Sequence, residues 1–181
     1  MSSNDMNPFT LSFARREAPA KDMAALTISL LLALAVAALA GLATWSSVDG
    51  WYAHADRTLW NPPNQVFGPV WSVLYSVMAV AAWLVWRQPS SPERTVALRT
   101  YVAQLALNAA WPPLFFLLYD VIGGVGLWMS LGWILMLDFA VLATIVFFWR
   151  VSRLSSVMLF PYWTWLLFAT ALNASLAVMN G

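Results

Sequence analysis

Five long apolar stretches, separated by short polar segments, dominate the sequence. Each stretch has about the 20 apolar residues that an α-helix needs to cross a bilayer. The pattern predicts an all-α integral membrane protein, a bundle of five transmembrane helices within residues 23–181 that follows a polar amino-terminal tail at residues 1–22. The predicted spans cover residues 23–44, 66–86, 96–118, 121–149 and 154–179.

The composition agrees with a membrane location. Of the 181 residues, 61% are hydrophobic and 9% are charged, whereas a soluble domain carries about 25% charged residues. Five spans use most of the apolar residues, which leaves little of the chain for a separate soluble domain. The chain also contains 12 tryptophans, more than a membrane location or helix formation requires.

Basic residues fall mainly on one side of the predicted bundle. Eight of them lie in or beside the amino-terminal tail, the second connection and the fourth connection, whereas Arg57 alone lies on the opposite side. Because positively charged segments remain inside, we predict that the amino terminus is inside and the carboxyl terminus outside. A cleaved signal peptide with its apolar core at residues 26–40 is an alternative, but its removal would destroy this charge asymmetry.

Charge and residue content exclude several classes of function. The net charge is +1, so nucleic-acid binding is not expected. The chain has no cysteine, and its single histidine, His54, belongs to no metal-binding motif, so we expect no metal site and no required cofactor. His54 as a haem axial ligand is an alternative to a solvated loop histidine.

Asp138 is the only carboxylate well inside a predicted span. An intramembrane charge is a candidate functional group by default, and a protonated, hydrogen-bonded packing residue is the other interpretation. A single carboxylate is not the chain of ionisable groups that an ion channel or proton pump requires.

Polar and aromatic side chains share faces on three predicted spans. In the third span, Gln104, Asn108 and Trp111 lie at positions i, i+4 and i+7, directly before Pro112 and Pro113. The prolines lack the N–H that would bond the carbonyls of residues 108 and 109, and such carbonyls survive at membrane depth only when buried in protein or lining a cavity. A structural kink is the simpler interpretation and a pocket wall the functional one. Matching stripes are Trp71 and Tyr75 on the second span, and Trp165, Ala169 and Asn173 on the fifth.

The first connection, residues 45–65, is long for a small bundle and rich in aromatic residues. Long ordered loops are often lids, and this one holds Trp51, His54, Arg57, Trp60 and Asn61. A cavity with aromatic walls and a few amides suits a flat, weakly polar ligand such as a porphyrin, a sterol or a heterocycle. For a porphyrin, Arg57, His54 and Asn61 are the candidates to meet the carboxylates.

Small residues recur every four positions along the first span, at 25, 29, 33, 37 and 41. Such a stripe lets another helix approach closely. Packing within the bundle is one interpretation, and a contact between two copies of the chain is the other. Glycines and a serine at positions 124, 126, 130 and 132 offer a second such face.

Several blocks of sequence resemble the TspO/MBR family. They are Trp51-Tyr52, the run from Trp60-Asn-Pro-Pro to Met78, Gln104 to Phe116, and Pro161 to Asn173. The resemblance covers about residues 23–178 and implies a five-helix bundle, commonly a homodimer, that binds porphyrins and, in animals, cholesterol and benzodiazepine-type ligands. It implies a pocket formed by Trp51, Trp60, Trp71, Tyr75, Asn108, Trp111, Trp165 and Ala169.

The resemblance leads to a specific functional expectation. We expect a binding protein in the lipid bilayer for protoporphyrin IX, haem or similar flat hydrophobic ligands, with a sensory, regulatory or transport role. The alternative is an enzyme-like, light-dependent degradation of protoporphyrin, as some bacterial members promote. Sterol binding is not expected, because the Tyr and Arg of the motif proposed for animal members are missing after Asn173.

Overall fold

The computed structural model describes residues 19–48 and 50–181, with side chains described for residues 22–42 and 50–181. Most of the predicted tail therefore lies outside the described residues. The helices are α1 (Pro19–Val48), α2 (Trp51–His54), α3 (Asn64–Trp86), α4 (Pro92–Ile122), α5 (Gly124–Val151), α6 (Arg153–Met158) and α7 (Phe160–Asn180). No strand occurs in the described ranges, which confirms the all-α prediction.

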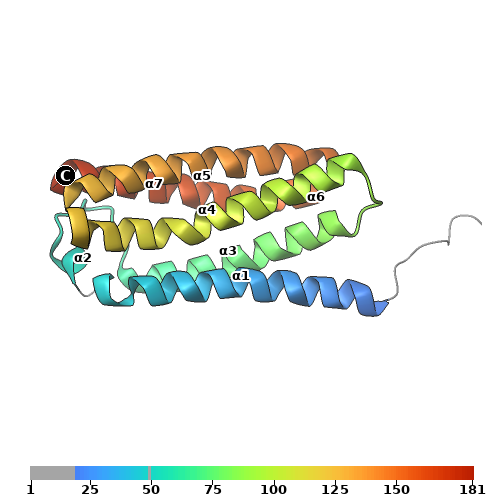
Figure 1. Ribbon diagram of the computed structural model, residues 1–181, viewed down its shortest axis with the longest axis horizontal. Coiled ribbons are helices and arrows are strands. Elements are labelled where there is room, and N and C mark those ends of the chain that lie inside the picture. Colours follow the sequence, from blue (N-terminus) through green and yellow to red (C-terminus); the bar gives the residue numbers. More distant parts are fainter. Residues whose placement is uncertain (1–18, 49) are drawn as a thin grey trace, which may run out of the picture.

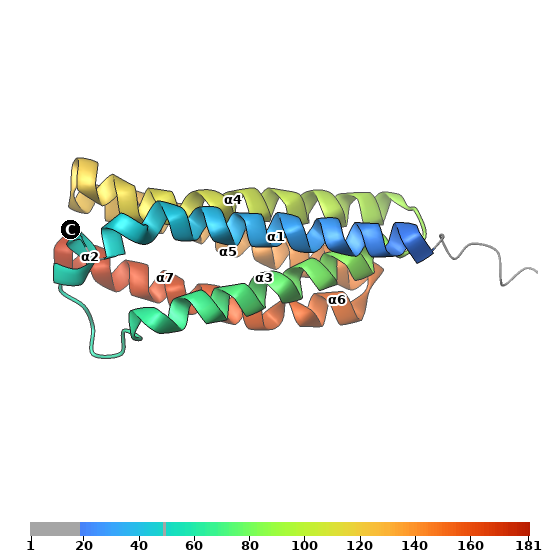
Figure 2. The ribbon, with the colours of Figure 1, turned by 90° about the horizontal axis from the view of Figure 1, so that it is seen from below.

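In the described part of the chain, five spans are long and apolar enough to cross a membrane: α1, α3, α4, α5, and α6 with α7 together. Each runs antiparallel to the one before it, so the start of α1 and the carboxyl terminus lie at opposite ends of the bundle (Figure 1). Around the bundle, α1 contacts α3 and α4, α5 contacts α4 and α7, and α3 contacts α6 and α7. Figure 2 shows α1 on the outside of the bundle, with α3 and α4 on either side of it.

The fourth span begins later than the sequence suggested. We predicted a break at residues 119–120, but α4 continues to Ile122 and the chain turns at Gly123. Gly123 has φ 62°, a left-handed conformation that glycine adopts without steric cost. Tyr119 remains helical, and its ring stacks on Trp51 with ring centroids 4.0 Å apart. The turn is therefore set by the glycine and not by the two polar residues before it.

Local sequence explains where α4 begins and how the start of α1 is held in place. Ser91 caps α4, its hydroxyl accepting a bond from the Arg94 amide, and Pro92 occupies the first turn, where no N–H is needed. The start of α1 is fixed to the end of α3, because Arg87 forms an ion pair of 3.2 Å with Asp22. In addition, the Trp83 indole donates to the Asp22 carbonyl. These contacts position α1 beside α3.

The small-residue stripes pack within the bundle at some of their positions. On α1, Ala33 is fully buried, and Ala37 and Gly41 line a cavity. On α5, a Cβ built on Gly126 would lie 2.7 Å from the backbone of Leu118, so glycine allows α4 and α5 their close approach. Packing inside one chain therefore holds for Ala33 and Gly126, whereas Gly41 and Gly132 are exposed. Self-association remains a prediction.

Candidate ligand-binding site

A cavity of about 510 Å³ opens between α1, α3, α4 and α7, near the end of the bundle where α2 lies. Its volume is within the range of about 300–1,000 Å³ that is typical of small-molecule sites. Residues from all four of these helices and from α2 line it. They are Leu34, Ala37, Ala38, Ala40, Gly41, Tyr52, Asn64, Phe67, Gly68, Trp71, Ser72, Tyr75, Asn108, Trp111, Pro112, Phe115, Phe116, Ala169, Leu172, Asn173 and Leu176.

One side of the cavity is aromatic and the other aliphatic. The Trp71 ring centroid lies 5.6 Å from that of Tyr75 and 6.5 Å from that of Trp111, and Trp111 in turn contacts Phe115. Opposite them, α1 contributes only small or aliphatic residues. A flat ligand can therefore stack on indole rings on one face while α1 covers the other.

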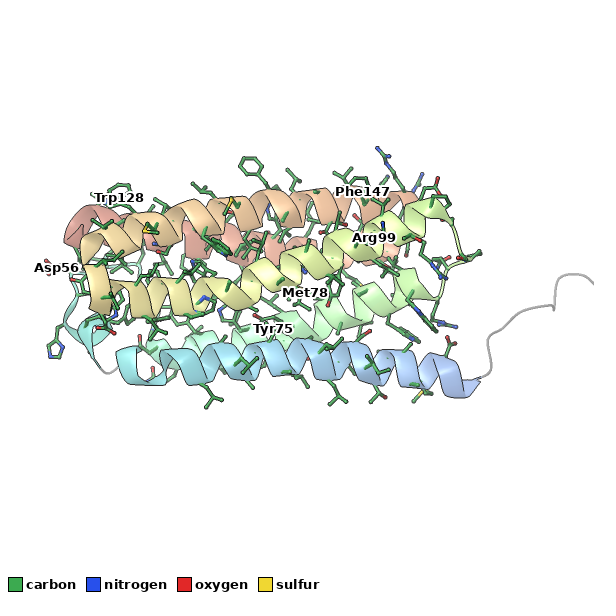
Figure 3. All side chains as sticks on the ribbon, in the orientation of Figure 1. Asp56, Tyr75, Met78, Arg99, Trp128 and Phe147 are labelled. Atoms are coloured by element: carbon green, nitrogen blue, oxygen red, sulfur yellow. The ribbon has the colours of Figure 1, made fainter. Side chains whose placement is uncertain are left out.

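Hydrogen-bonded side chains form the polar floor of the cavity. The Tyr75 hydroxyl donates to Oδ1 of Asn108 at 2.5 Å, and Nδ2 of Asn108 donates to the Tyr162 hydroxyl at 2.6 Å. Tyr162 then donates to Oε1 of Gln104 at 3.0 Å. An amide has two donor protons and two acceptor lone pairs, so Asn108 retains one of each for a ligand. Figure 3 shows Tyr75 and the neighbouring Met78 in the interior of the bundle.

A second amide fixes the position of an indole in the wall. Oδ1 of Asn173 accepts from Trp111 Nε1 at 3.4 Å and from the Ser130 hydroxyl at 3.2 Å. Its Nδ2 donates to the Leu127 carbonyl at 3.2 Å. Asn173 on α7 thus connects α4 and α5, and the Trp111 ring is held with its face available to the cavity.

Helix α2 and residues 55–63 form a lid over this end of the bundle. Nε1 of Trp51 donates to the Phe116 carbonyl at 2.9 Å, which attaches the lid to α4. The Asp56 amide donates to Oδ1 of Asn180, and Nδ2 of Asn180 donates back to the Asp56 carbonyl, both at 2.9 Å. The lid is therefore fastened to two different helices.

Within the lid, the Tyr52 hydroxyl donates to Oδ1 of Asn61 at 3.3 Å. Burial raises the pKa of Tyr52 above its usual value, so the hydroxyl remains a donor at neutral pH. The guanidinium carbon of Arg57 lies 5.3 Å from the centre of the Tyr52 ring. Since Tyr52 lines the cavity and Arg57 is exposed, a positive charge stands at the cavity mouth.

The structure brings together six of the residues singled out from the sequence. Trp71, Tyr75, Asn108, Trp111, Ala169 and Asn173 all line the cavity. The remaining residues are placed around it: Gln104 lies behind Asn108 in the polar floor, and Trp51, Asn61 and Arg57 belong to the lid. His54 is exposed, and its ring nitrogen lies 3.0 Å from the Gly50 carbonyl oxygen.

Besides Trp51 of the lid, two more predicted tryptophans lie outside the cavity lining. Trp165 contacts Phe67 and Phe168, and Trp60 contacts Phe168 from the lid while remaining 49% exposed. Trp165 and Asn173 are eight residues apart, which turns a helix by roughly 80° beyond two full turns. Asn173 lines the cavity, whereas Trp165 contacts Phe67, which lines the cavity, and does not line the cavity itself.

Sequence reasoning missed several parts of the site. Tyr162, which is fully buried and bonds both Asn108 and Gln104, lies seven residues before Ala169 and so shares a helical face with it; that spacing was a usable signal. On α1, the small-residue stripe included Ala37 and Gly41, but we interpreted it as a helix-packing face and not as a cavity wall.

The two prolines of α4 do not end the helix, and the first of them lies in the cavity wall. Pro112 is buried and lines the cavity. The indole of Trp133 on α5 donates to the Leu107 carbonyl at 2.9 Å, just before this point. The pocket-wall interpretation therefore holds for Pro112, which lines the cavity within a continuous helix.

Among the described residues, no group of three or more His, Cys, Asp or Glu side chains is placed to hold a metal ion. The donors at the cavity are instead amides, hydroxyls and indoles. This set matches a neutral or weakly polar organic ligand held by shape and a few hydrogen bonds.

Comparison with known proteins identifies the family. The model of the TspO/MBR family matches residues 28–179. The human translocator protein is 41% identical over 125 residues, covering 68% of this chain and 70% of its own. The tryptophan-rich protein TspO of Archaeoglobus fulgidus is 36% identical over 155 residues, covering 86% and 96%. The tryptophan-rich sensory protein of Cereibacter sphaeroides is 33% identical over 132 residues, covering 73% and 78%. With five spans and a match over most of its length, the chain belongs to the TspO/MBR family of integral membrane proteins.

Proposed function

We propose that this protein binds porphyrins, such as protoporphyrin IX or haem, or similar flat hydrophobic ligands in the cavity beneath the lid. The observation that carries the proposal is the cavity itself: about 510 Å³, walled by Trp71, Trp111 and Phe115, with Asn108 in its floor. Indole and phenyl faces stack on a flat conjugated ring, and an amide fixes its orientation.

The residues of the lid favour a ligand that carries acidic groups at one edge. Arg57 stands beside Tyr52 at the mouth, where a carboxylate of a bound porphyrin would meet a guanidinium, its strongest charge-assisted partner. His54 and Asn61 belong to the same lid. The apolar ring would occupy the cavity while the carboxylates reach the aqueous end.

We further propose that binding serves a sensory or regulatory role. Relatives are named a tryptophan-rich sensory protein and a translocator protein, which supports this role. The cavity is enclosed by helices and a lid fastened at two points, an arrangement that suits retention of a ligand better than rapid passage.

Titration with protoporphyrin IX tests the proposal. In detergent-solubilised protein, we expect quenching of tryptophan fluorescence with micromolar affinity, and Trp111→Ala should weaken binding about tenfold or more through loss of a stacking face. Trp149→Ala is the matched control and should keep the affinity, because Trp149 is exposed in the last turn of α5, and α5 ends at the opposite end of the bundle from α2 (Figure 1).

A second variant tests the cavity independently, in case Trp111→Ala loses affinity because it does not fold. Leu34→Trp would fill the cavity from the α1 side without removing any hydrogen bond of the floor, and it should also abolish binding. Normal binding by both Trp111→Ala and Leu34→Trp would show that the ligand is bound elsewhere.

A further inference from the structure

Asp138 lies halfway along α5, at a depth where a charged side chain is costly. The residue is 8% exposed. Its Oδ2 lies 2.7 Å from the Thr170 hydroxyl on α7, and its Oδ1 has no hydrogen-bond partner. Within the described part of the chain it forms no ion pair. On the neighbouring α7, the titratable group is the phenol of Tyr162, which brings no positive charge.

The Thr170 hydroxyl has two acceptors within reach, and its single proton can go to either of them. The Thr170 oxygen lies 2.7 Å from Asp138 Oδ2 and 3.0 Å from the Leu166 carbonyl oxygen. A hydroxyl has one proton to donate, and a backbone carbonyl only accepts. If Thr170 donates to Leu166, the contact with Asp138 is a hydrogen bond only when the carboxyl group carries a proton and donates it to Thr170.

The alternative proton arrangement leaves more groups unsatisfied. An ionised Asp138 would hold a full negative charge inside the membrane with one hydroxyl donor, an unpartnered Oδ1 and no cation. A neutral acid instead leaves only a carbonyl-type oxygen without a partner, and this is far less costly than an unpaired charge. The geometry therefore favours the protonated form.

The same contact lies behind the ligand cavity. Thr170 is adjacent to Ala169 and one helical turn before Asn173, both of which line the cavity. Ser130 on α5 bonds Asn173, and Asp138 on α5 bonds Thr170. Helix α5 does not line the cavity, yet these two side chains hold the α7 wall in place.

We propose that Asp138 is a proton-binding site in the membrane interior which, as a neutral carboxylic acid, donates to Thr170 and positions the α7 wall of the cavity. Asp138 is thus a positioning residue and touches no ligand. Its effect on ligand affinity rests on the proposed function, whereas its protonation does not.

Infrared spectroscopy of the protein in lipid bilayers at neutral pH tests the protonation directly. A protonated carboxyl group has a C=O stretching band that an ionised carboxylate lacks. We expect this band in the unaltered protein, its loss in Asp138→Asn, and its persistence in Glu93→Gln, which alters an exposed carboxylate. Absence of the band from the unaltered protein would overturn the proposal, whether or not any porphyrin binds.

Titration of variants with protoporphyrin IX tests the positioning. Asp138→Asn retains a donor for Thr170 and should keep its affinity, whereas Asp138→Ala and Thr170→Val should each weaken it about tenfold through loss of a buried hydrogen bond. The control is Thr164→Val, because Thr164 makes the same bond to its own helix, to Phe160, and is exposed. Equal losses in Asp138→Asn and Asp138→Ala, or full affinity in Thr170→Val, would contradict the positioning role.

Discussion

The hydrogen bond between Tyr75 and Asn108 connects α3 to α4 across the floor of the cavity, and its contribution to stability can be measured. Tyr75→Phe removes a buried donor and leaves Oδ1 of Asn108 without a partner. Asn108→Ala removes that acceptor and also the donor to Tyr162. With net values near 1 kcal/mol per hydrogen bond and about 1–3 kcal/mol for a buried group left unpaired, we expect losses of about 1–2 and about 2–4 kcal/mol, respectively.

The double variant distinguishes this hydrogen bond from general packing. Once Asn108 is absent, the Tyr75 hydroxyl has lost its acceptor, so its removal should cost little more. The combined loss should therefore fall short of the sum of the single losses by about 1–2 kcal/mol. Reversible unfolding in mixed detergent micelles, followed by circular dichroism, measures the four free energies.

The neighbouring hydroxyl of Ser76 provides the control. It bonds only its own helix, at the Ser72 carbonyl, so Ser76→Ala should change stability by no more than about 0.5 kcal/mol and add independently to Asn108→Ala. Free energies that add within about 0.3–0.5 kcal/mol for Tyr75 and Asn108 would refute the reasoning, because groups joined by a buried bond cannot be independent.

Three further expectations concern the lid and the membrane. Asn180→Ala removes both bonds to residue 56, so it should raise hydrogen–deuterium exchange across the lid and speed ligand dissociation several-fold. Unchanged exchange and dissociation would contradict this and show that the bond from Trp51 alone keeps the lid closed. Arg57→Gln should weaken binding of protoporphyrin IX about tenfold but leave its dimethyl ester unaffected; an equal effect on both ligands would exclude a role in carboxylate binding. Since the chain has no cysteine, an impermeant maleimide should label Ala53→Cys in intact cells and Ser90→Cys only after lysis, and the reverse result would overturn the predicted orientation.

Most of the fold could be predicted because membrane helices are specified by length and composition. The five apolar stretches correspond to the five spans, and the error at residues 119–120 arose from assigning the turn to polarity. Gly123 provides the backbone conformation that a turn requires, whereas Tyr119 and Asp120 are accommodated in the helix. At this turn, the presence of a glycine predicted the position better than the polarity of the side chains did.

The site was predictable only where polar residues interrupt an apolar helix. Asn108, Trp111 and Tyr75 stand out for this reason, and they do line the cavity. Trp165 was misplaced because a stripe extended over eight residues drifts off its face. Ala37 belongs to the small-residue stripe of the first span, which the sequence indicated only as a packing face. Leu34 could not be found, since an apolar residue in an apolar helix can face either a cavity or lipid.

The paired bonds between Asp56 and Asn180 have a consequence for the order of assembly. The two residues are 124 positions apart, so every span must be made before they can meet. Chains are synthesised from the amino terminus, and contacts between distant segments form late. The cover of the cavity is thus completed by the last turn of the last helix, and a closed lid reports that the whole bundle has formed.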